Sequence, residues 1–312
     1  MEKVLILGPS VTDIVQEVNK LPKEGEEIVP LLTRQRISGM GYCAAHLFSL
    51  LDMPALLYTN PGSGLYGDFV QAGLDREKIE WISRNEETAG CLYTLVDSSG
   101  NAVRMAVPGS EYGFLPYGHA EAGTFVLLDG SYLYDETADL FPEIFTDEAR
   151  TVLFCPHYAG IEADPDLFRT LLESSPWLYL SEEEAAAYGE GKDLGRIASD
   201  LHALTQKPVI ILRSNGSGYF LDGADAFETD SRITKIKDRT GMGEAFAAGF
   251  LLAKNAGADN RSALSFACEC AALAASSESS VIEAKDKERV RNLLVQAILT
   301  ESRGGRMQDF LS

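Results

Sequence analysis

A short segment late in the chain joins glycines to an acidic residue in a pattern that suits phosphoryl chemistry. It reads Asp238-Arg239-Thr240-Gly241-Met242-Gly243-Glu244 and leads into the small, apolar stretch 245–253. A Gly-rich turn at a helix start lets the backbone approach a ligand, and the first helical N–H groups point at an anion. Glu244 could accept a proton from a hydroxyl while neighbouring amides stabilise the transferring group. The alternative is a capping acid favoured by the helix dipole.

A second glycine loop precedes another apolar stretch. Residues 38–45 read SGMGYCAA and are similar in type and order to residues 240–247, TGMGEAFA. A GxG pair alone is a weak signal, because ordinary turns also contain it. The chain has no GxxxxGK[ST], and its first strand and turn, residues 7–13, lack GxGxxG. A nucleotide-dependent oxidoreductase is therefore the less favoured class of enzyme.

Short apolar runs alternate with helical stretches, and this order indicates an α/β fold. The runs do not alternate polar with apolar residues, which is typical of strands covered on both faces of a mainly parallel sheet. They are Val4–Leu7, Phe125–Leu128, Val152–Cys155, Trp177–Leu180 and Val209–Leu212. Helices are predicted at residues 164–173, 182–189 and 193–205. We expect an open α/β sandwich.

Two stretches interrupt this rhythm and resemble antiparallel strands. They are residues 27–37 and 91–107, and the second contains the hairpin signal DSSGN at 97–101. Strand-like insertions in a parallel α/β fold can pair into a small sheet, and such a sheet makes a natural lid over a site. No linker-like segment divides the chain, so we expect a single domain over residues 1–312 that carries these two lid insertions.

Charge and cysteine content narrow the class of partner. The formal net charge is −20 and we find no local basic patch, which argues against nucleic acid or an anionic membrane as partner. A small anionic ligand stays compatible, because backbone amides can bind one. The five cysteines are few and scattered, so no disulfide framework is expected. Cys268 and Cys270 stand in an Ala-rich helical stretch and are interpreted as small core residues.

The ends and the apolar runs give no sign of export or of a membrane anchor. The chain starts Met1-Glu2-Lys3 and continues into a short apolar strand without a signal-peptide pattern. No apolar run reaches the length of a membrane span. We therefore expect a soluble, cytoplasmic protein.

The segment 238–250 resembles the C-terminal signature of the ribokinase/PfkB family of carbohydrate kinases, roughly D-T-x-G-A-G-D-x-F-x-x-G. Other features follow in the family's order. They are Gly8, Asp13 and Leu21-Pro22 near the start, the glycines of 38–45, the segment Ser181-Glu182-Glu183-Glu184, and the loop 213–218. The resemblance covers nearly the whole chain. It implies a ribokinase-like three-layer sandwich with a mainly parallel sheet and a small antiparallel β lid.

The resemblance also implies an activity: ATP-dependent phosphorylation of a hydroxyl on a sugar or nucleoside-like small molecule. Glu244 would be the catalytic base, and the amides of Gly241, Met242 and Gly243 would form the anion hole. The substrate would meet Asp13, Gly39, Gly41 and Cys43. The nucleotide would meet Arg213, Asn215, Gly216, Gly218 and Cys268. In-line phosphoryl transfer depends on positioning and charge stabilisation more than on covalent chemistry.

Metal ions and oligomeric state are implied in the same way. Glu184 would place Mg²⁺ through water, and Asp238 and Thr240 would lie near a monovalent cation, with K⁺ as the candidate. In some relatives the lid sheet pairs between subunits, which would allow a homodimer through the lid.

The chain departs from the family pattern at the base and around it. The family base is Asp, whereas this chain has Glu244, and Cys43 replaces a sugar-binding Asn. The extra methylene moves the carboxylate by roughly 1 Å, and a misplacement of that order can cost about a hundredfold in rate. Two hypotheses remain: an active kinase, or an impaired pseudoenzyme of the same fold that binds a ligand. Retention of a basic carboxylate favours the kinase.

Overall fold

The structure is a computed structural model that describes residues 2–83, 87–113, 125–134, 144, 150–158, 165–174, 176–189 and 191–308. Within them, nine strands form a main sheet in the order β13-β12-β11-β10-β9-β8-β1-β4-β5. They are β1 Val4–Leu7, β4 Ala55–Tyr58, β5 Trp81–Ile82, β8 Phe125–Asp129, β9 Thr151–Cys155, β10 Trp177–Ser181, β11 Val209–Leu212, β12 Gly218–Asp222 and β13 Asp225–Thr229. Neighbours from β11 to β5 are parallel, and β12 and β13 add an antiparallel hairpin. The predicted strands are confirmed.

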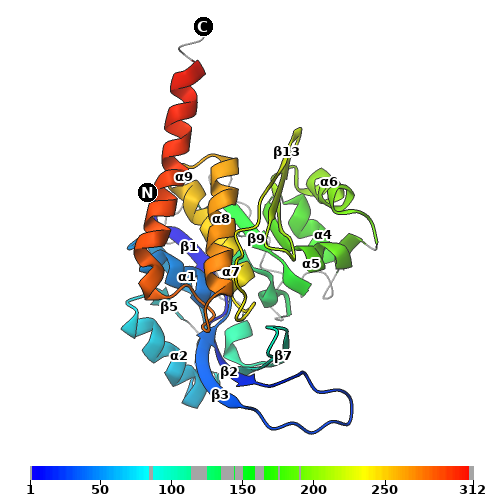
Figure 1. Ribbon diagram of the computed structural model, residues 1–312, viewed down its shortest axis with the longest axis vertical. Helices are drawn as coiled ribbons and strands as arrows, with labels where there is room; N and C mark the ends of the chain where they lie inside the picture. The colour runs from blue at the N-terminus through cyan, green and yellow to red at the C-terminus, as the bar shows by residue number, and fades with distance from the viewer. Residues whose placement is uncertain are drawn as a thin grey trace.

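Helices cover both faces of this sheet, so the molecule has three layers (Figure 1). One face carries α1 Met40–Leu50, α2 Gly64–Arg76, α7 Met242–Asn255, α8 Asn260–Ala275 and α9 Lys287–Gln308. The other carries α4 Pro165–Glu173, α5 Glu182–Gly189 and α6 Leu194–Thr205. Short 3₁₀ turns lie at Ser110–Tyr112, Gly130–Tyr134 and Ala284–Asp286. Successive strand residues face opposite cores, so Val4 and Leu5 enter different clusters. The predicted α/β sandwich is confirmed.

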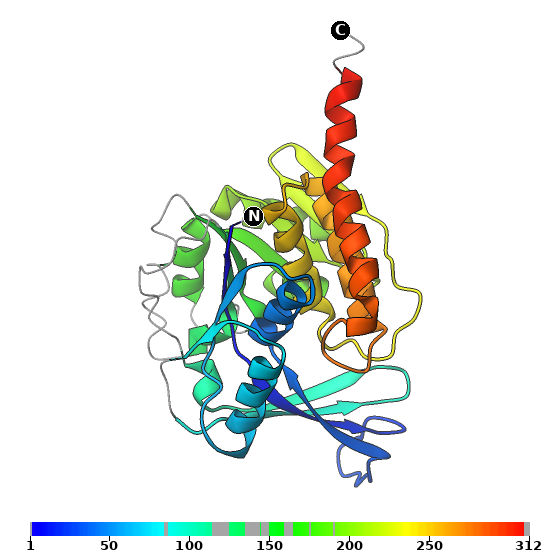
Figure 2. The ribbon, with the colours of Figure 1, turned by 90° about the vertical axis from the view of Figure 1, so that its left-hand side faces the viewer.

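A second, four-stranded sheet extends from one end of the main body, at the bottom of Figures 1 and 2. Its order is β3-β2-β6-β7, with β2 Val11–Glu17, β3 Leu32–Ser38, β6 Cys91–Val96 and β7 Ala102–Val107. The β2–β3 and β6–β7 pairs are antiparallel, and β2 pairs with β6 in parallel. The hairpin predicted at 97–101 is confirmed, with Asp97 N–H donating to the Asn101 carbonyl at 3.0 Å.

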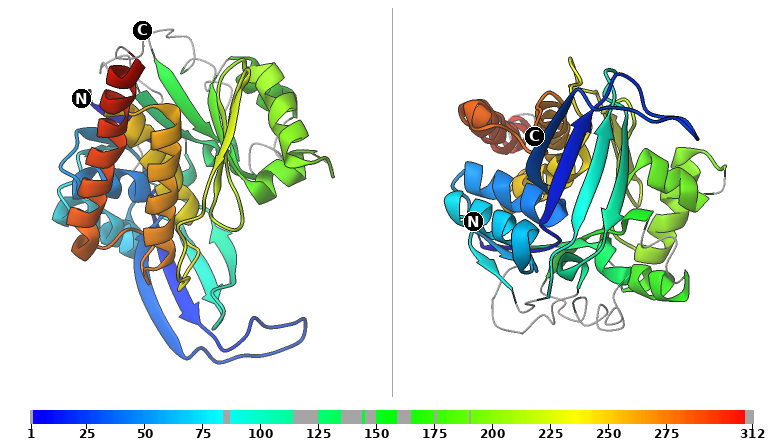
Figure 3. Two further views of the ribbon diagram at one scale, coloured as in Figure 1. Left: turned by 45° about the horizontal axis from the view of Figure 1, so that its top comes forward. Right: turned by 90° about the horizontal axis from the view of Figure 1, so that it is seen from below.

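Residues 27–37 and 91–107 both contribute strands to this one small sheet, but those strands are not neighbours in it. The chain leaves the main sheet after β1 and runs on at once into β2, which lies between β3 and β6. The strand in the first segment is also shorter than predicted, because residues 27–31 belong to the connection that precedes β3. Figure 3 (left) shows this β2–β3 connection reaching beyond the end of the sheet.

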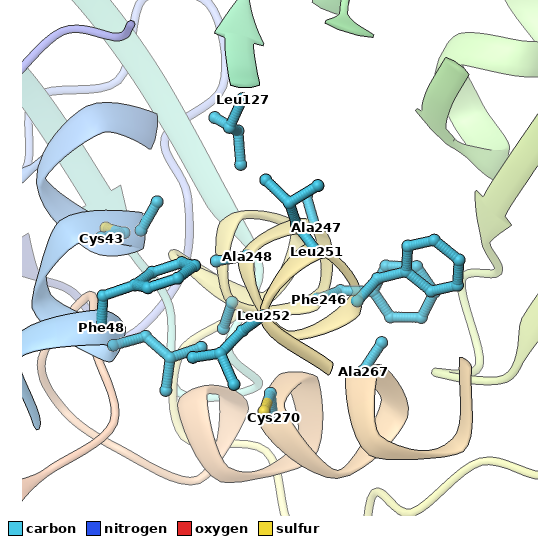
Figure 4. Packing of buried hydrophobic residues seen from close by; sticks show 14 of the residues in the cluster. Cys43, Phe48, Leu127, Phe246, Ala247, Ala248, Leu251, Leu252, Ala267 and Cys270 are labelled. Carbon is cyan, nitrogen blue, oxygen red and sulfur yellow. The ribbon is translucent and has the colours of Figure 1, made fainter. Parts of the chain in front are cut away.

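Helix α7 is the central buried helix of the larger face. Figure 4 shows it between α1, with Cys43 and Phe48, and α8, with Ala267 and Cys270. Small residues permit this close packing: a side chain added at Gly249 would come 2.9 Å from Cys270 Sγ. Cys268 and Cys270 are both fully buried, so their interpretation as core residues is confirmed. Packing on both sides fixes the direction of α7 and the place of its first turn. Within the described residues, no helix is long and apolar enough to cross a membrane.

Candidate active site

The first turn of α7 offers unpaired backbone donors beside one carboxylate. Gly241 precedes the helix with a φ of 80°, and a side chain there would collide with the Ser280 carbonyl. A helix start leaves its first amides without internal partners. Among the residues described, the N–H groups of Gly241, Gly243 and Glu244 donate no hydrogen bond, whereas Met242 N–H donates to the Arg239 carbonyl at 3.2 Å. Within the described residues, these three N–H groups are therefore free to donate to a ligand.

The half-buried Glu244 side chain lies in the same turn. Its carboxylate makes no hydrogen bond or ion pair to any described residue. It lies near Cys43, because the charge of Glu244 adds to the effect of burial in raising the pKa of the Cys43 thiol. A carboxylate without a protein partner keeps its lone pairs for a donor that comes from outside, such as a substrate hydroxyl.

Asp238 is buried just before this turn and both of its oxygens are engaged. Oδ1 accepts from the Thr240 N–H at 2.8 Å, and Oδ2 accepts from Arg36 Nη1 at 2.6 Å. Burial alone would raise the pKa of Asp238, but the Arg36 guanidinium and the hydrogen bonds from Thr240 together outweigh burial and hold that pKa below its ordinary value. Asp238 is thus an ionised, paired carboxylate that shapes the loop leading to α7.

Asp13, the predicted substrate ligand, is fully buried in β2. Its Oδ1 accepts from Thr94 Oγ1 at 2.6 Å and its Oδ2 accepts from Arg36 Nε at 2.9 Å. Arg36 is directly opposite Asp13 in the β2–β3 register, so the pair follows from strand pairing. One guanidinium therefore joins two buried carboxylates, Asp13 of the small sheet and Asp238 of the α7 loop.

These contacts decide whether the predicted monovalent cation fits beside Asp238 and Thr240. Arg36 Nη1 lies on Asp238 Oδ2 and is also 3.3 Å from the Glu278 carbonyl. Thr240 Oγ1 accepts from Arg104 Nη2 at 2.8 Å. A metal ion at this position would face two guanidinium groups, and like charges repel strongly in a buried setting. The residues present do not fit a monovalent cation.

The first glycine loop serves close packing at the start of α1. Gly41 N–H donates to the Pro9 carbonyl at 3.0 Å, and a side chain at Gly41 would collide with the Gly8 carbonyl. Cys43, two residues later, donates its S–H to the Ser280 carbonyl at 3.3 Å. Gly39, Gly41 and Cys43 thus hold α1 against the β1–β2 turn and against the loop that borders Gly241, within reach of the α7 site.

The 213–218 loop is the turn of the β11–β12 hairpin and is held mostly by its own groups. Asn215 Oδ1 accepts from the Ser217 N–H at 2.8 Å, and the Gly216 N–H donates to the Arg213 carbonyl at 2.8 Å. The Arg213 side chain pairs with Glu182 and Glu228. Arg239 Nη1 donates to the Ser214 carbonyl at 3.1 Å, so the structure brings the predicted nucleotide loop to the loop before α7.

Cys268 lies beneath this hairpin. It is fully buried in α8, and its Sγ is 3.2 Å from Thr229 Oγ1 on β13. Gly218 approaches the same helix, since a side chain there would come 2.9 Å from Leu264. Cys268 therefore packs beneath the strand β13, which pairs with β12 after the 213–218 loop.

Glu184, the predicted magnesium residue, belongs to a second buried cluster at the carboxyl ends of β8, β9 and β10. His157 Nδ1 is 3.1 Å from Glu184 Oε1, and His157 Nε2 is 3.1 Å from Asp129 Oδ2. Glu184 Oε2 also accepts from the Ser181 N–H at 2.8 Å. Burial would lower the pKa of His157, but Asp129 and Glu184 outweigh it and raise that pKa well above its usual value. The imidazole is therefore a charged bridge between two carboxylates.

Several residues of the site were not found from the sequence. Asp129 and His157 each follow a buried strand, and the carboxyl ends of parallel strands meet at one edge of a sheet, which could have indicated them. Arg36 and Arg104 lie in strands with no distinguishing pattern, because their roles depend on pairing partners far away in the chain. Within the described residues, no group of three or more His, Cys, Asp or Glu side chains has the geometry of a metal centre.

Comparisons with known proteins bear on the family and the fold of this chain. The model of the pfkB family carbohydrate kinases matches residues 1–287. Ribokinase of Arabidopsis thaliana is 22% identical over 310 residues, which cover 93% of this chain and 80% of that protein. A structure of the same plant's ribokinase complexed with ribose and ATP has a TM-score of 0.72 at 19% identity, covering 94% of this chain and 98% of that one. Burkholderia thailandensis nucleoside kinase in complex with inosine gives a TM-score of 0.78 at 16% identity, covering 94% and 98%.

The structural likenesses show a shared fold, and the family match spans most of the chain. The sequence motif at 238–250 and the α/β architecture with its second sheet point the same way. This chain belongs to the pfkB family of carbohydrate kinases.

Proposed function

We propose that this chain transfers the terminal phosphoryl group of ATP to a hydroxyl of a sugar or nucleoside. The observation that carries the proposal is Glu244, a carboxylate without a protein partner, in the same helix turn as unpaired amides. The carboxylate takes the hydroxyl proton, and the unpaired amides of Gly241 and Gly243 stabilise charge on the transferring group. The Met242 amide, which the family resemblance also assigns to the anion hole, already donates to the Arg239 carbonyl. Relatives of this fold include one solved with ribose and ATP and one with inosine, which supports both acceptor classes.

The nucleotide binds between the 213–218 loop and the start of α7. Arg239 connects these two segments through the Ser214 carbonyl, and Gly216 and Gly218 let the hairpin pack closely against Ile233 and Leu264. Arg213 and Asn215 shape the loop, and Cys268 supports it from α8. Calorimetry with ATP tests this placement: binding should be weakened in Arg239→Met and preserved in Arg169→Met, an exposed arginine of α4.

Mg²⁺ fits this site through water at Glu184. Both Glu184 oxygens hold a protein donor, yet a carboxylate has about four lone-pair sites and can accept more. When bound, Mg²⁺ neutralises charge on the phosphates. His157 and Asp129 keep the Glu184 carboxylate in a fixed orientation for that contact.

The substrate binds between the α7 turn and the small sheet, with Gly39, Gly41 and Cys43 at the base of the pocket. Asp13 contributes a substrate contact only after the small sheet moves, because its carboxylate is now buried and holds Thr94 and Arg36. The small sheet therefore acts as a lid of a single domain. Arg104 of β7 reaches Thr240 at the start of the catalytic loop, which supports this role.

The lid also offers a surface for a homodimer. Val103, Met105 and Val107 alternate along β7 and are each more than two-fifths exposed, with Met105 at 60%. Residues two apart share one face of a strand, so they form one apolar row. A second copy of the lid would cover that row, since an exposed apolar edge strand tends to pair.

A screen of acceptors tests the function. The chain is incubated with ATP, Mg²⁺ and a panel of sugars and nucleosides that includes ribose and inosine, and ADP release is compared with that of Glu244→Gln. We expect one acceptor class to raise ADP release well above the variant. The second candidate is a ligand-binding pseudoenzyme. It is favoured by Asp13, whose two carboxylate oxygens already accept hydrogen bonds from Thr94 and Arg36 and so do not face a substrate. It would be supported if no acceptor raised ADP release while calorimetry still detected ATP binding.

A further inference from the structure

A guanidinium lies where the α7 loop meets the lid, and it holds both sides. Arg36 is 8% exposed, with Nε on Asp13 and Nη1 on Asp238 and the Glu278 carbonyl. Its Nη2 is buried without a hydrogen-bond partner among the residues described. The contacts span three parts of the chain that are distant in sequence: the strand β2, the loop before α7, and the loop after α8.

The charges at this point require a cation. Asp13 and Asp238 are both buried carboxylates, at 0% and 1% exposed, and an isolated buried charge is strongly unfavourable. Arg36 is the one described cation that bonds to both. Arg34 Nη2 lies 4.0 Å from Asp238 Oδ2, but the Arg34 side chain is committed to Glu17. Removal of one partner from a buried pair leaves an uncompensated charge, which is strongly destabilising.

The same charge matters for anion binding. Asp238 stands three positions before Gly241, and its Oδ1 holds the Thr240 N–H in that loop. An uncompensated carboxylate so close to the unpaired amides of α7 would oppose a transferring phosphoryl group, since electrostatic effects are large in buried sites. Arg36 offsets part of this negative charge and also fixes the loop.

We propose that Arg36 is a tethered cation that takes the place of a monovalent metal ion beside the phosphoryl loop, so that this chain needs no K⁺. The proposal rests on the kinase function proposed above for the role of the loop, although the cation effect itself can be measured without turnover. Arg36 acts as a positioning residue, because it reaches the α7 loop through Asp238.

The first measurement uses stability, so that it stands without any known acceptor. Thermal unfolding of the whole chain is followed in KCl and in tetramethylammonium chloride at equal ionic strength, for the wild type, Arg36→Met and Arg34→Met. We expect the wild type and Arg34→Met to melt at the same temperature in both salts, because Arg36 is present in each. Arg36→Met should melt lower in tetramethylammonium, and K⁺ should restore part of the loss, because K⁺ can then enter beside Asp238.

The outcomes separate a cation substitute from a plain structural brace. The proposal fails if K⁺ stabilises the wild type, or if Arg36→Met is destabilised equally in both salts. If Arg36→Met does not fold, Arg36→Lys serves instead. It retains a positive charge without the planar fork, and it should be indifferent to K⁺. If K⁺ raises the melting temperature of both Arg36→Lys and the wild type, the proposal is wrong.

The second measurement uses turnover of an acceptor identified in the screen. Wild-type turnover in the two salts should agree within about twofold, whereas Arg36→Met should lose about tenfold or more in tetramethylammonium and recover partly in K⁺. A wild type that K⁺ activates about tenfold would contradict the proposal. Absence of any turnover would count against the kinase function alone, because the salt dependence of melting would still report on Arg36.

Discussion

Arg104 Nη2 donates to Thr240 Oγ1 over 2.8 Å, and this bond joins β7 of the lid to the loop that leads into the catalytic helix. Arg104 and Thr240 are 136 residues apart in the chain. If the small sheet acts as the lid in the proposed function, we expect this bond to break when the lid opens. Lids of this kind set the access of substrate and water to a site.

Loss of this bond should weaken substrate binding more than nucleotide binding. For Arg104→Met we expect KM for the acceptor to rise about tenfold, since a charge-assisted hydrogen bond contributes roughly 1.5–3 kcal/mol. ATP affinity measured by calorimetry should stay unchanged. A double-mutant cycle with Thr240→Val checks the cause: the double variant should resemble the single ones. Additive effects of the two substitutions would show that the bond does not act as a unit.

Glu244→Gln should remove the proton acceptor while it preserves size and nucleotide affinity. We expect turnover to fall by about 10² to 10⁴, the usual contribution of a positioned base. Glu244→Asp is a sharper test, because it restores the family residue. A pocket adapted to the longer acid should lose rate, whereas an impaired site should gain it. Unchanged turnover of an established acceptor in Glu244→Gln would mean that Glu244 is only a helix-start acid.

Asp13→Asn should reveal whether Asp13 mainly stabilises the fold or mainly binds substrate. The substitution leaves Arg36 with one buried carboxylate in place of two and weakens a charge-assisted hydrogen bond, so we expect a loss of roughly 1.5–3 kcal/mol in the free energy of unfolding. Denaturant titration measures this loss. Thr94→Val is the matched control, because it removes the other partner of Asp13 without changing charge. An unchanged stability with a raised KM would assign Asp13 to the substrate alone.

Glu77 should make stability depend on pH on the acid side. It accepts from Tyr42 Oη at 2.9 Å and from His46 Nδ1 at 2.7 Å, which links α1 to the end of α2. Burial would raise the pKa of Glu77, but the bond and charge of His46, the bond from Tyr42 and the charge of Arg76 together outweigh burial and lower that pKa below 4.5. A lowered carboxyl pKa stabilises the fold above the ordinary value, and that stability is lost as pH falls through the folded pKa.

The test compares the wild type with Glu77→Gln by denaturant titration at a series of pH values. The wild type should be the more stable protein near neutral pH, and the difference should shrink as pH falls below 4.5. Glu80→Gln is the control, because its partner Lys3 forms a more exposed pair that contributes little. A difference that is constant down to low pH would contradict the assignment.

The lid edge should control assembly. Met105→Glu places a charge in the apolar row of β7 without touching the face that carries Arg104, and we expect it to convert a dimer to a monomer in light scattering. Val295→Glu, on the exposed side of α9, should leave the assembly unchanged. A wild type that is monomeric at all concentrations would rule out the homodimer through the lid.

Local sequence was sufficient for the framework of the fold. The strand at Val4–Leu7 is apolar without alternation, because helices cover both of its faces, and that signal is local. The start of α7 could likewise be predicted, since a glycine precedes a run of small apolar residues. Gly241 does adopt a φ of 80°, which glycine tolerates best. The motif at 238–250 likewise predicts from the sequence that Glu244 is the candidate base.

Only the tertiary structure decided which charges meet. Arg36 and Asp238 are 202 residues apart, and their contact depends on the register of β2 with β3 and on the position of the lid against α7. A one-residue change of register would turn Arg36 to the other face of its sheet. Sequence pattern predicts that a strand exists but not its partner, so the prediction of a metal cation at Asp238 could not foresee that an arginine from a distant strand would occupy that place.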